Sequence, residues 1–225
     1  MIAHVPPSPA LRGAPPRLRQ AAIALIVVAT VTGLLGAAFM PYLLVEHPLL
    51  LIGLSPGPAN LVLAAGSLDP WSFVLVGLPR RILGFVASYA FGALYGYAAV
   101  SWVAGKSARL QRWTRLAERV VGRYGAWVVL LLPFQLLAVV AGAMGTRFRS
   151  FLLAITASLA IHVPLTYWFG DLAAVWTDRL LAFLRAHLLE STLVAVALVA
   201  LSQIVGRRRR AEPPAPESEP APAEE

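Results

Sequence analysis

The chain has 225 residues, of which 58% are hydrophobic and only 13% charged, and its formal net charge is +8. Soluble domains are typically about 45–50% apolar and about 25% charged, so this composition excludes an ordinary soluble domain and indicates a membrane protein. The chain contains no cysteine, which excludes disulfides and cysteine-based metal sites. Its length favours one compact membrane domain.

The first 20 residues contain five prolines and the basic residues Arg12, Arg17 and Arg19, without helical or strand periodicity. We expect a disordered basic arm over residues 1–20. Residues 21–44 follow without a charge and are long enough to cross about 30 Å of hydrocarbon, which predicts a first transmembrane helix. The apolar core of a cleaved signal peptide is shorter, about 7–15 residues, so we expect this helix to be retained.

Residues 49–68 are apolar but are interrupted by several helix-breaking residues, namely Gly53, Pro56, Gly57, Pro58 and Gly66. This punctuation predicts two short half-helices rather than one spanning helix. Residues 71–78 are too short to cross a bilayer, and Pro79-Arg80-Arg81 interrupts them. We therefore predict the second full span at residues 82–103, which are rich in small side chains that allow helices to approach closely in lipid.

Residues 106–123 carry six basic side chains against the single acid Glu118. Leu110, Trp113, Leu116 and Val120 recur at helical spacing, which predicts a basic amphipathic helix on an anionic membrane surface. A solvated connecting helix is the alternative. Nucleic-acid binding is not expected, because the basic residues lie beside membrane segments and no recognition motif accompanies them.

Residues 126–145 form a second interrupted apolar segment, and residues 151–169 predict a third span that contains His162 and Pro164. Residues 193–205, extended backwards through residues 180–189, predict the fourth span. The membrane domain is thus expected at residues 21–206. Four arginines at positions 207–210 end it, and the Pro, Ala and Glu tail that completes the segment 207–225 is expected to be disordered.

The two interrupted segments resemble each other. Each contains a proline near its start and one amide residue (Pro56 and Asn60, then Pro133 and Gln135), and each closes on a glycine, Gly66 or Gly142. Ser72-Phe73 follows the first segment and Ser150-Phe151 follows the second. Paired broken segments in the two halves of a chain point to a site near the membrane midplane, as in transporters. Two ordinary helices kinked by proline are the alternative.

The distribution of basic residues predicts the orientation. With a cytoplasmic N-terminus and four crossings, 15 basic residues lie inside and only four outside, namely Arg80, Arg81, Arg179 and Arg185. Both termini are then cytoplasmic, and the two broken segments enter from opposite sides. The predicted fold is an all-α polytopic membrane protein with about four transmembrane helices and two opposed re-entrant hairpins in an inverted repeat.

The chain resembles the DedA/VTT (SNARE-associated Golgi protein) superfamily over residues 54–171. The resemblance rests on Pro56-Gly57 with Ala65-Gly66-Ser67-Leu68, on Arg123-Tyr124-Gly125-Ala126 leading to Pro133, and on Ala141-Gly142-Ala143-Met144 with the basic segment through Phe151. The step from Pro133 to Gly142 is more similar to the VTT branch than to the commonest bacterial DedA pattern. The resemblance implies opposed re-entrant hairpins, with Pro56, Gly57, Gly66, Pro133 and Gly142 as their structural residues.

The resemblance also implies movement of phospholipids or polyprenyl-phosphate lipids between leaflets, in the plasma (inner) membrane. The family's acid after the first Pro-Gly and its arginine near the second proline are both missing here, which favours passive scrambling or a diverged substrate over proton-driven transport. A non-transporting scaffold that supports envelope assembly through protein contacts is the alternative function. The expected partners are lipids with anionic headgroups, and a homo-oligomer stays open.

The candidate residues for a lipid path are Asn60, Arg80, Arg81, Gln135, Arg147, Arg149 and His162. The four arginines could bind lipid phosphate bidentately at the two mouths of the path, or could anchor helix ends. Asn60 and Gln135 could contact a headgroup or cap free backbone groups. His162 is either a satisfied buried histidine or a proton relay. The sequence shows no Ser-His-Asp set, metal-ligand cluster or phosphate-binding glycine loop, so we expect neither an enzyme nor a cofactor.

Overall fold

The computed structural model describes residues 15–104, 112, 116–122 and 134–211, and every regular element named here is an α-helix. The N-terminal half contains α1 (Pro16–Ala38), α2 (Met40–Glu46), α3 (Pro48–Leu54), α4 (Pro58–Ala65), α5 (Pro70–Tyr95) and α6 (Tyr97–Ala104). The C-terminal half contains α9 (Gln135–Ala143), α10 (Phe148–Leu172), α11 (Ala174–Ala186) and α12 (Leu188–Ala211).

Proline sets where the first helices begin. Each of the helices α1 to α5 has a proline in its first or second position. The ring fixes φ near the helical value, and its missing N–H would have no helical partner at that position anyway. Asp69 adds a side-chain cap to α5, since its carboxylate accepts a hydrogen bond of 2.9 Å from the backbone N–H of Ser72.

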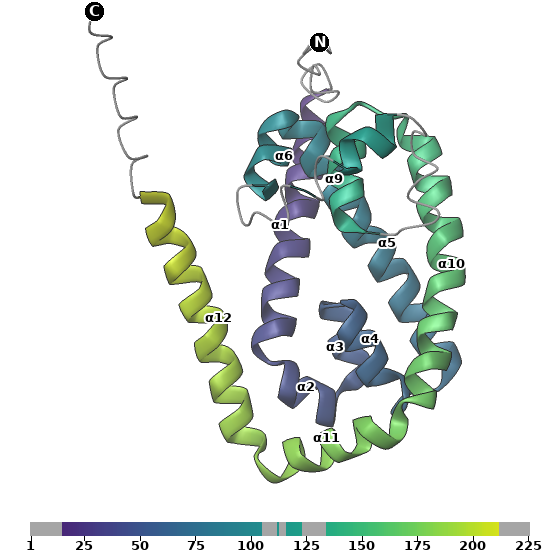
Figure 1. The fold of residues 1–225 in the computed structure, drawn as a ribbon, viewed down its shortest axis with the longest axis vertical. Helices are drawn as coiled ribbons and strands as arrows, with labels where there is room; N and C mark the ends of the chain where they lie inside the picture. Colours follow the sequence, from purple (N-terminus) through teal and green to yellow (C-terminus); the bar gives the residue numbers. More distant parts are fainter. Residues whose placement is uncertain (1–14, 105–111, 113–115, 123–133, 212–225) are drawn as a thin grey trace, which may run out of the picture.

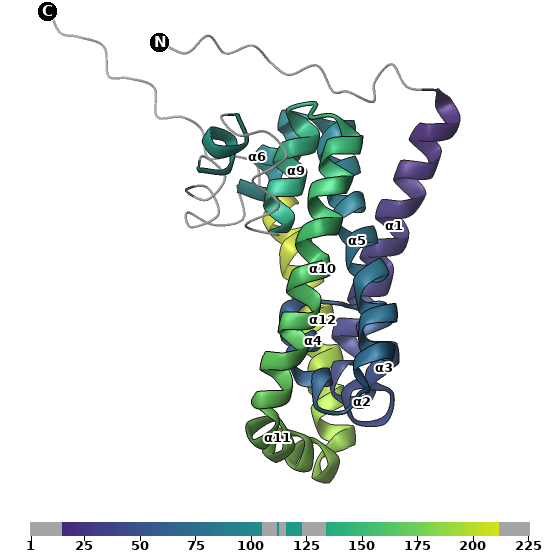
Figure 2. The ribbon, with the colours of Figure 1, turned by 90° about the vertical axis from the view of Figure 1, so that its right-hand side faces the viewer.

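Helices α5 and α10 are the most buried of the four long helices and are called the central helices; they stand side by side and run in opposite directions (Figure 1). Short helices α3 and α4 lie at one end of this pair, while α6 and α9 lie at the other (Figures 1 and 2). Helix α11 runs across the end of the bundle between α10 and α12. The largest fully buried side chains come from the central helices and the short ones, among them Phe73, Phe85 and Phe151.

Four described helices are long and apolar enough to cross a membrane, namely α1, α5, α10 and residues Leu188–Val205 of α12. The apolar windows of α1 and α12 are only 6% and 0% buried inside the protein. Large side chains such as Val28 and Leu193 therefore point away from the bundle at 58% and 68% exposure. Such continuous apolar exposure marks a surface for lipid. An all-helical membrane protein with four candidate spans agrees with the sequence prediction.

The predicted break at Pro79-Arg80-Arg81 is wrong. Helix α5 continues through Pro79 to Tyr95 and is capped by Gly96, whose positive φ of 57° favours glycine. The second span therefore covers Pro70–Tyr95 rather than residues 82–103, and Arg80 and Arg81 lie near its centre rather than in an external turn. Membrane helices tolerate an internal proline when neighbouring groups satisfy the freed backbone.

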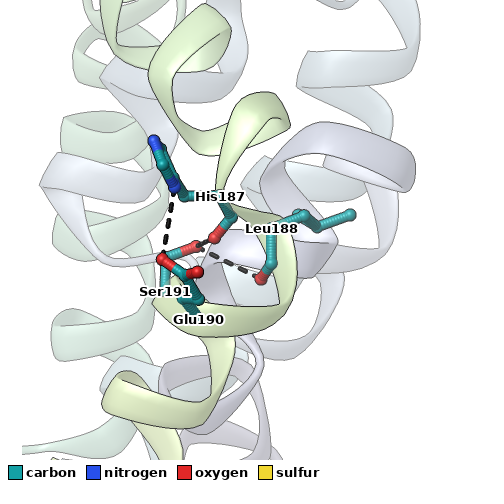
Figure 3. A network of polar contacts seen from close by, with 4 residues as sticks. All are labelled: His187, Leu188, Glu190 and Ser191. Atoms are coloured by element: carbon teal, nitrogen blue, oxygen red, sulfur yellow. Dashed lines mark hydrogen bonds and ion pairs between the residues drawn. The ribbon is translucent and has the colours of Figure 1, made fainter.

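Two further boundaries differ from the prediction. The predicted first span is divided at Phe39 into α1 and α2, and α1 begins at Pro16, inside the predicted arm. The predicted fourth span is divided at His187 into α11 and α12. At this junction the His187 Nδ1 lies 3.2 Å from Oε2 of Glu190, and the Ser191 hydroxyl donates to the carbonyls of His187 and Leu188 (Figure 3). The backbone N–H of Ser191 also donates to the His187 carbonyl, at 2.9 Å, so these side-chain bonds reinforce the first helical bond after the break.

The predicted half-helices at residues 49–68 are present as α3 and α4, separated by Ser55, Pro56 and Gly57. Of the second interrupted segment, residues 134–145 are described and contain α9, while Pro133 lies outside the described residues. The predicted amphipathic helix at residues 106–123 also lies mostly outside them. The same applies to residues 1–14 of the arm and to residues 212–225 of the tail.

Candidate functional site

Arg80 binds the end of α3, in the middle of the first broken segment. Its Nε donates to the Gly53 carbonyl at 2.8 Å, and its Nη2 donates to the Leu54 carbonyl at 2.8 Å and to the Thr32 hydroxyl at 2.6 Å. The last carbonyls of α3 have no partner within their own helix, and leaving them unpaired in hydrocarbon would be costly. Arg80 therefore closes the C-terminal end of α3, a role for which its fork of donors is well suited.

These bonds fix how far the hairpin of α3 and α4 extends along the bundle. Arg80 follows the start of α5 by ten residues, which at about 1.5 Å per residue is about 15 Å. The connection between α3 and α4 therefore lies beside the middle of α5. Helix α4 then returns to the level at which α5 begins.

The tip of this hairpin is stabilised by Asn60. The Asn60 amide donates to the Ser55 carbonyl at 2.9 Å, so of the two expectations for Asn60 the structure supports backbone capping. Pro56 precedes Gly57, whose φ of −62° and ψ of 152° are open to any residue. A Cβ atom at Gly57 would meet no atom closer than 3.9 Å. Gly57 is thus part of the tip without being sterically required there.

Arg81 differs from its neighbour Arg80. It is half-buried, and no hydrogen bond or ion pair joins it to another described residue. It lies one helical turn after Gly77, which faces Leu61 of α4 and Val163 of α10, so Arg81 is on the same side of α5 as those two helices. None of the described acidic residues lies in the middle of a spanning helix. The positive charge near the centre of α5 therefore has no carboxylate partner in the part of the chain described.

Gln135 lies near Arg80, on the first turn of α9, and its side chain is exposed. A Cβ atom built on Gly84 would lie 3.8 Å from the Gln135 Nε2 and 4.0 Å from the Arg80 Nη1. Gly84 thus lies within contact distance of both polar groups. Sequence reasoning missed Gly84 and Thr32, since nothing local distinguishes them from other small residues of the apolar segments.

Arg147 and Arg149 do not occupy positions that match Arg80 and Arg81. They flank the start of α10, where both are exposed, whereas Arg80 and Arg81 lie at the middle of α5. Arg147 is at the N-cap but makes no side-chain cap bond. Its true counterpart in the first half is the N-cap Asp69, which carries the opposite charge. The hypothesis of two equivalent arginine pairs at two mouths is therefore wrong.

His162 lies in the middle of α10 and is half-buried. Its Nδ1 is 2.8 Å from the Ser158 carbonyl, which can only accept, so the Nδ1 carries the proton of this bond. The hydroxyl of Ser158 is 3.4 Å from the same nitrogen. His162 is thus a histidine satisfied by its own helix, the first of the two readings, and no described acid or base is bonded to it.

Two tyrosines, which the sequence analysis did not single out, connect the central helices at their two ends. Tyr89 of α5 stacks on Phe151 of α10 with ring centroids 4.6 Å apart, and its hydroxyl donates to the Thr146 carbonyl. Tyr167 of α10 meets Phe73 of α5 at 5.2 Å, and its hydroxyl donates to the Leu68 carbonyl at 3.1 Å. The two contacts are built from corresponding residues of the two halves of the chain. The members of each corresponding pair are 78 positions apart: Phe73 and Phe151, Tyr89 and Tyr167, Leu68 and Thr146.

Two glycines, Gly92 and Gly170, are also 78 positions apart. A Cβ atom on Gly92 of α5 would lie 1.9 Å from the Val139 carbonyl oxygen of α9. A Cβ atom on Gly170 of α10 would lie 2.5 Å from the Ala65 Cβ of α4. Each long helix therefore packs its late glycine against the short helix of the other half of the chain. Gly66 has no such role, since it is exposed at the end of α4 and a Cβ there would meet Ala174 at an ordinary 3.4 Å.

No protein-family model, no curated protein and no solved structure matches this chain. Among the described residues, no group of three or more His, Cys, Asp or Glu side chains could hold a metal ion. Function must therefore be inferred from the polar groups at the centre of the bundle and from the contacts that relate its two halves.

Proposed function

We propose that the chain is a membrane protein of DedA/VTT type that moves lipids between leaflets, with both termini in the cytoplasm and with the plasma (inner) membrane as its location. The observation that carries this proposal is Arg81, a half-buried cation without a described partner near the middle of a spanning helix. Charged groups at that depth are expensive, and they commonly mark the path of a substrate. An anionic headgroup crossing the bilayer would supply the missing counter-charge.

The proposed inverted repeat is supported by the contacts that recur 78 residues apart. Helix α4 and then α5 in the first half correspond to α9 and then α10 in the second. Because α5 and α10 run in opposite directions, the two halves would have opposite orientations in a bilayer. Under this proposal the hairpin of α3 and α4 is re-entrant, with its tip held at mid-depth by Arg80. Irregular backbone at that depth needs such protein partners.

The proposed substrate is a lipid with an anionic phosphate headgroup, either a phospholipid or a polyprenyl phosphate. Its acyl chains would stay in the bilayer while the headgroup passes Arg81, close to Gln135. A phosphate crossing hydrocarbon alone would face a large desolvation cost. A guanidinium with free donors lowers that cost, because it binds two phosphate oxygens at once. Since the chain lacks the acid and arginine of the family pattern, we propose passive movement down a gradient.

A reconstitution assay tests this function. Purified protein is placed in liposomes that contain a fluorescent anionic phospholipid, and an impermeant reductant then bleaches the outer leaflet. Wild-type protein should allow bleaching well beyond the outer half. Arg81→Gln should slow this transfer by about 10- to 100-fold, the effect of losing about 1.5–3 kcal/mol from a charged hydrogen bond.

Arg185→Gln provides the matched control, because it removes an exposed arginine of α11 that has no hydrogen bond to another described residue and no role in the proposed path. It should transfer lipid at close to the wild-type rate. If wild-type protein bleaches no more lipid than empty liposomes, lipid movement is wrong and the non-transporting scaffold becomes the better explanation. If Arg81→Gln matches wild type, the path does not use Arg81.

A further inference from the structure

The hydroxyl groups of Tyr89 and Tyr167 bond to the two connections that lead into the long helices. Thr146 lies between α9 and α10, and Leu68 lies between α4 and α5. Each tyrosine also packs its ring on a phenylalanine in the first turn of the neighbouring long helix, Phe151 or Phe73. Each tyrosine therefore holds the late part of one long helix against the start of the other.

These two contacts lie at opposite ends of the bundle. Tyr167 packs at the level of Phe73, and Tyr89 follows Phe73 by 16 residues on α5, which corresponds to about 24 Å along the helix axis. That separation is close to the thickness of the hydrocarbon, about 30 Å. Arg81 lies eight residues from both Phe73 and Tyr89, midway between the two levels. Ser158, which is fully buried, occupies a similar level on α10.

We infer that the Tyr89–Thr146 and Tyr167–Leu68 hydrogen bonds are two latches, each closing one end of the proposed headgroup path past Arg81. The inference rests on the proposed function, in which a headgroup must enter at one end and leave at the other. A single bond between a neutral phenol and a carbonyl is weak enough to open thermally. Opening one latch while the other stays closed would admit a headgroup from one leaflet only.

The residues beside the two latches differ in charge. Thr146 is followed directly by Arg147, with Arg149 close by, whereas Leu68 is followed by Asp69. These three side chains are exposed, so they are available to a headgroup at the membrane surface. An anionic headgroup is attracted to the end with Arg147 and Arg149 and repelled from the end with Asp69. The Tyr89 latch is thus the entrance for anionic lipids.

Accessibility of a single cysteine tests the latches without measuring lipid transfer. The natural chain has no cysteine, so Ser158→Cys introduces one probe at the buried centre of α10. Its reaction with an impermeant, charged thiol reagent is measured in intact cells and in inverted membrane vesicles. The rate in each preparation reports access from one side of the membrane.

Tyr89→Phe should raise the rate about five-fold from the side of Thr146 only, and Tyr167→Phe should raise it by the same factor from the side of Leu68 only. Phenylalanine keeps the ring packing, and an unchanged melting temperature within a few degrees shows that each variant is folded. Tyr95→Phe is the control, because Tyr95 is exposed on the same helix, its ring meets Phe91, and its hydroxyl has no hydrogen bond to another described residue. It should leave both rates unchanged.

Equal rates in all variants, or an increase from the same side for both tyrosines, would overturn the latches. The result is independent of the transfer assay. If lipid moves but the labelling rates do not change, the latches are wrong and the proposed function stands. If wild-type protein moves no lipid but the sided labelling appears, the proposed function is wrong and the two gates stand.

Discussion

Gly92 on α5 and Gly142 on α9 each bring one helix backbone against the other. A Cβ atom at Gly92 would lie 1.9 Å from the Val139 carbonyl oxygen, and one at Gly142 would lie 2.1 Å from the Tyr89 carbonyl oxygen. Both obstacles are backbone atoms, which cannot turn aside as a side chain can. In lipid, where apolar side chains gain little by leaving their surroundings, such close backbone packing is a main source of helix association.

Alanine at either glycine should therefore destabilise the protein. We expect Gly92→Ala and Gly142→Ala each to cost about 3 kcal/mol, at the upper end of the range for overpacking, because α5 and α9 must separate. Thermal unfolding in detergent, followed by size-exclusion chromatography, measures the loss. Gly33→Ala on α1 is the control, since a Cβ there meets nothing within 4 Å. A melting temperature for Gly92→Ala equal to that of Gly33→Ala would contradict the packing argument.

Gly66 gives a second comparison. The resemblance between the two interrupted segments pairs Gly66 with Gly142, which predicts similar sensitivity to substitution at both positions. The structure predicts instead that Gly66→Ala is close to neutral, because the added Cβ would meet the Ala174 Cβ at 3.4 Å and no backbone atom closer than 3.9 Å. Gly170→Ala should be the damaging change in that half. The same unfolding assay compares them, and a large loss at Gly66 would refute this assignment.

Arg80 should be needed for stability, unlike its neighbour. Arg80→Lys keeps the charge but cannot direct a fork of donors at Gly53, Leu54 and Thr32 together, so at least one of these acceptors loses its partner. We expect a loss of about 1–3 kcal/mol in the free energy of unfolding. Arg81→Lys is the matched control and should unfold like wild type. Equal stability of the two variants would show that the Arg80 bonds contribute little.

The N-cap of α5 should make stability depend on pH in the acid range. The hydrogen bonds that Asp69 accepts from Ser72 lower the pKa of its carboxyl below the ordinary 3.8. The ionised form is thus the one stabilised by folding, so its contribution is complete above the ordinary pKa and is lost as the pH falls through the lowered one. Asp69→Asn, which keeps a capping acceptor, should flatten the fall in melting temperature between about pH 5 and pH 2. An unchanged profile would mean that Asp69 does not contribute.

The orientation is testable with two exposed serines. Ser67 precedes α5 and Ser101 follows it, so the charge distribution predicts Ser67 outside the cell and Ser101 inside. In otherwise cysteine-free protein, Ser67→Cys should react with an impermeant thiol reagent in intact cells, and Ser101→Cys only after the membrane is opened. The reverse pattern would invert the topology.

Local chemistry made part of the fold predictable. The two short helices of the first broken segment follow from the helix-breaking residues Pro56, Gly57 and Pro58. The match between Ser72-Phe73 and Ser150-Phe151 identifies the correct interval of 78 residues, since Phe73 and Phe151 make corresponding contacts. The pairing of Gly66 with Gly142 was misleading, because the sequence alone does not distinguish a glycine at an exposed helix end from one packed against a backbone.

The course of α5 could not be predicted from local sequence. Two adjacent arginines after a proline are typical of a turn, because each is costly in hydrocarbon. The partners that make Arg80 tolerable at mid-depth lie 26 to 48 residues earlier in the chain, on α3 and α1. Only the assembled helices bring these acceptors to the guanidinium, so the site at the centre of the bundle is a product of tertiary structure.

The three bonds of Arg80 also bear on how the chain enters the membrane during synthesis. On insertion scales an arginine at a helix centre costs about 2.5–3.5 kcal/mol, and α5 carries two with a mean hydropathy of 1.3, compared with 2.3 for α1. Helix α5 is therefore a poor candidate to leave the translocation channel alone. Thr32 and the α3 carbonyls are synthesised first and can receive Arg80 as it emerges. Biogenesis of this protein thus favours joint release of α1, the hairpin and α5 into lipid.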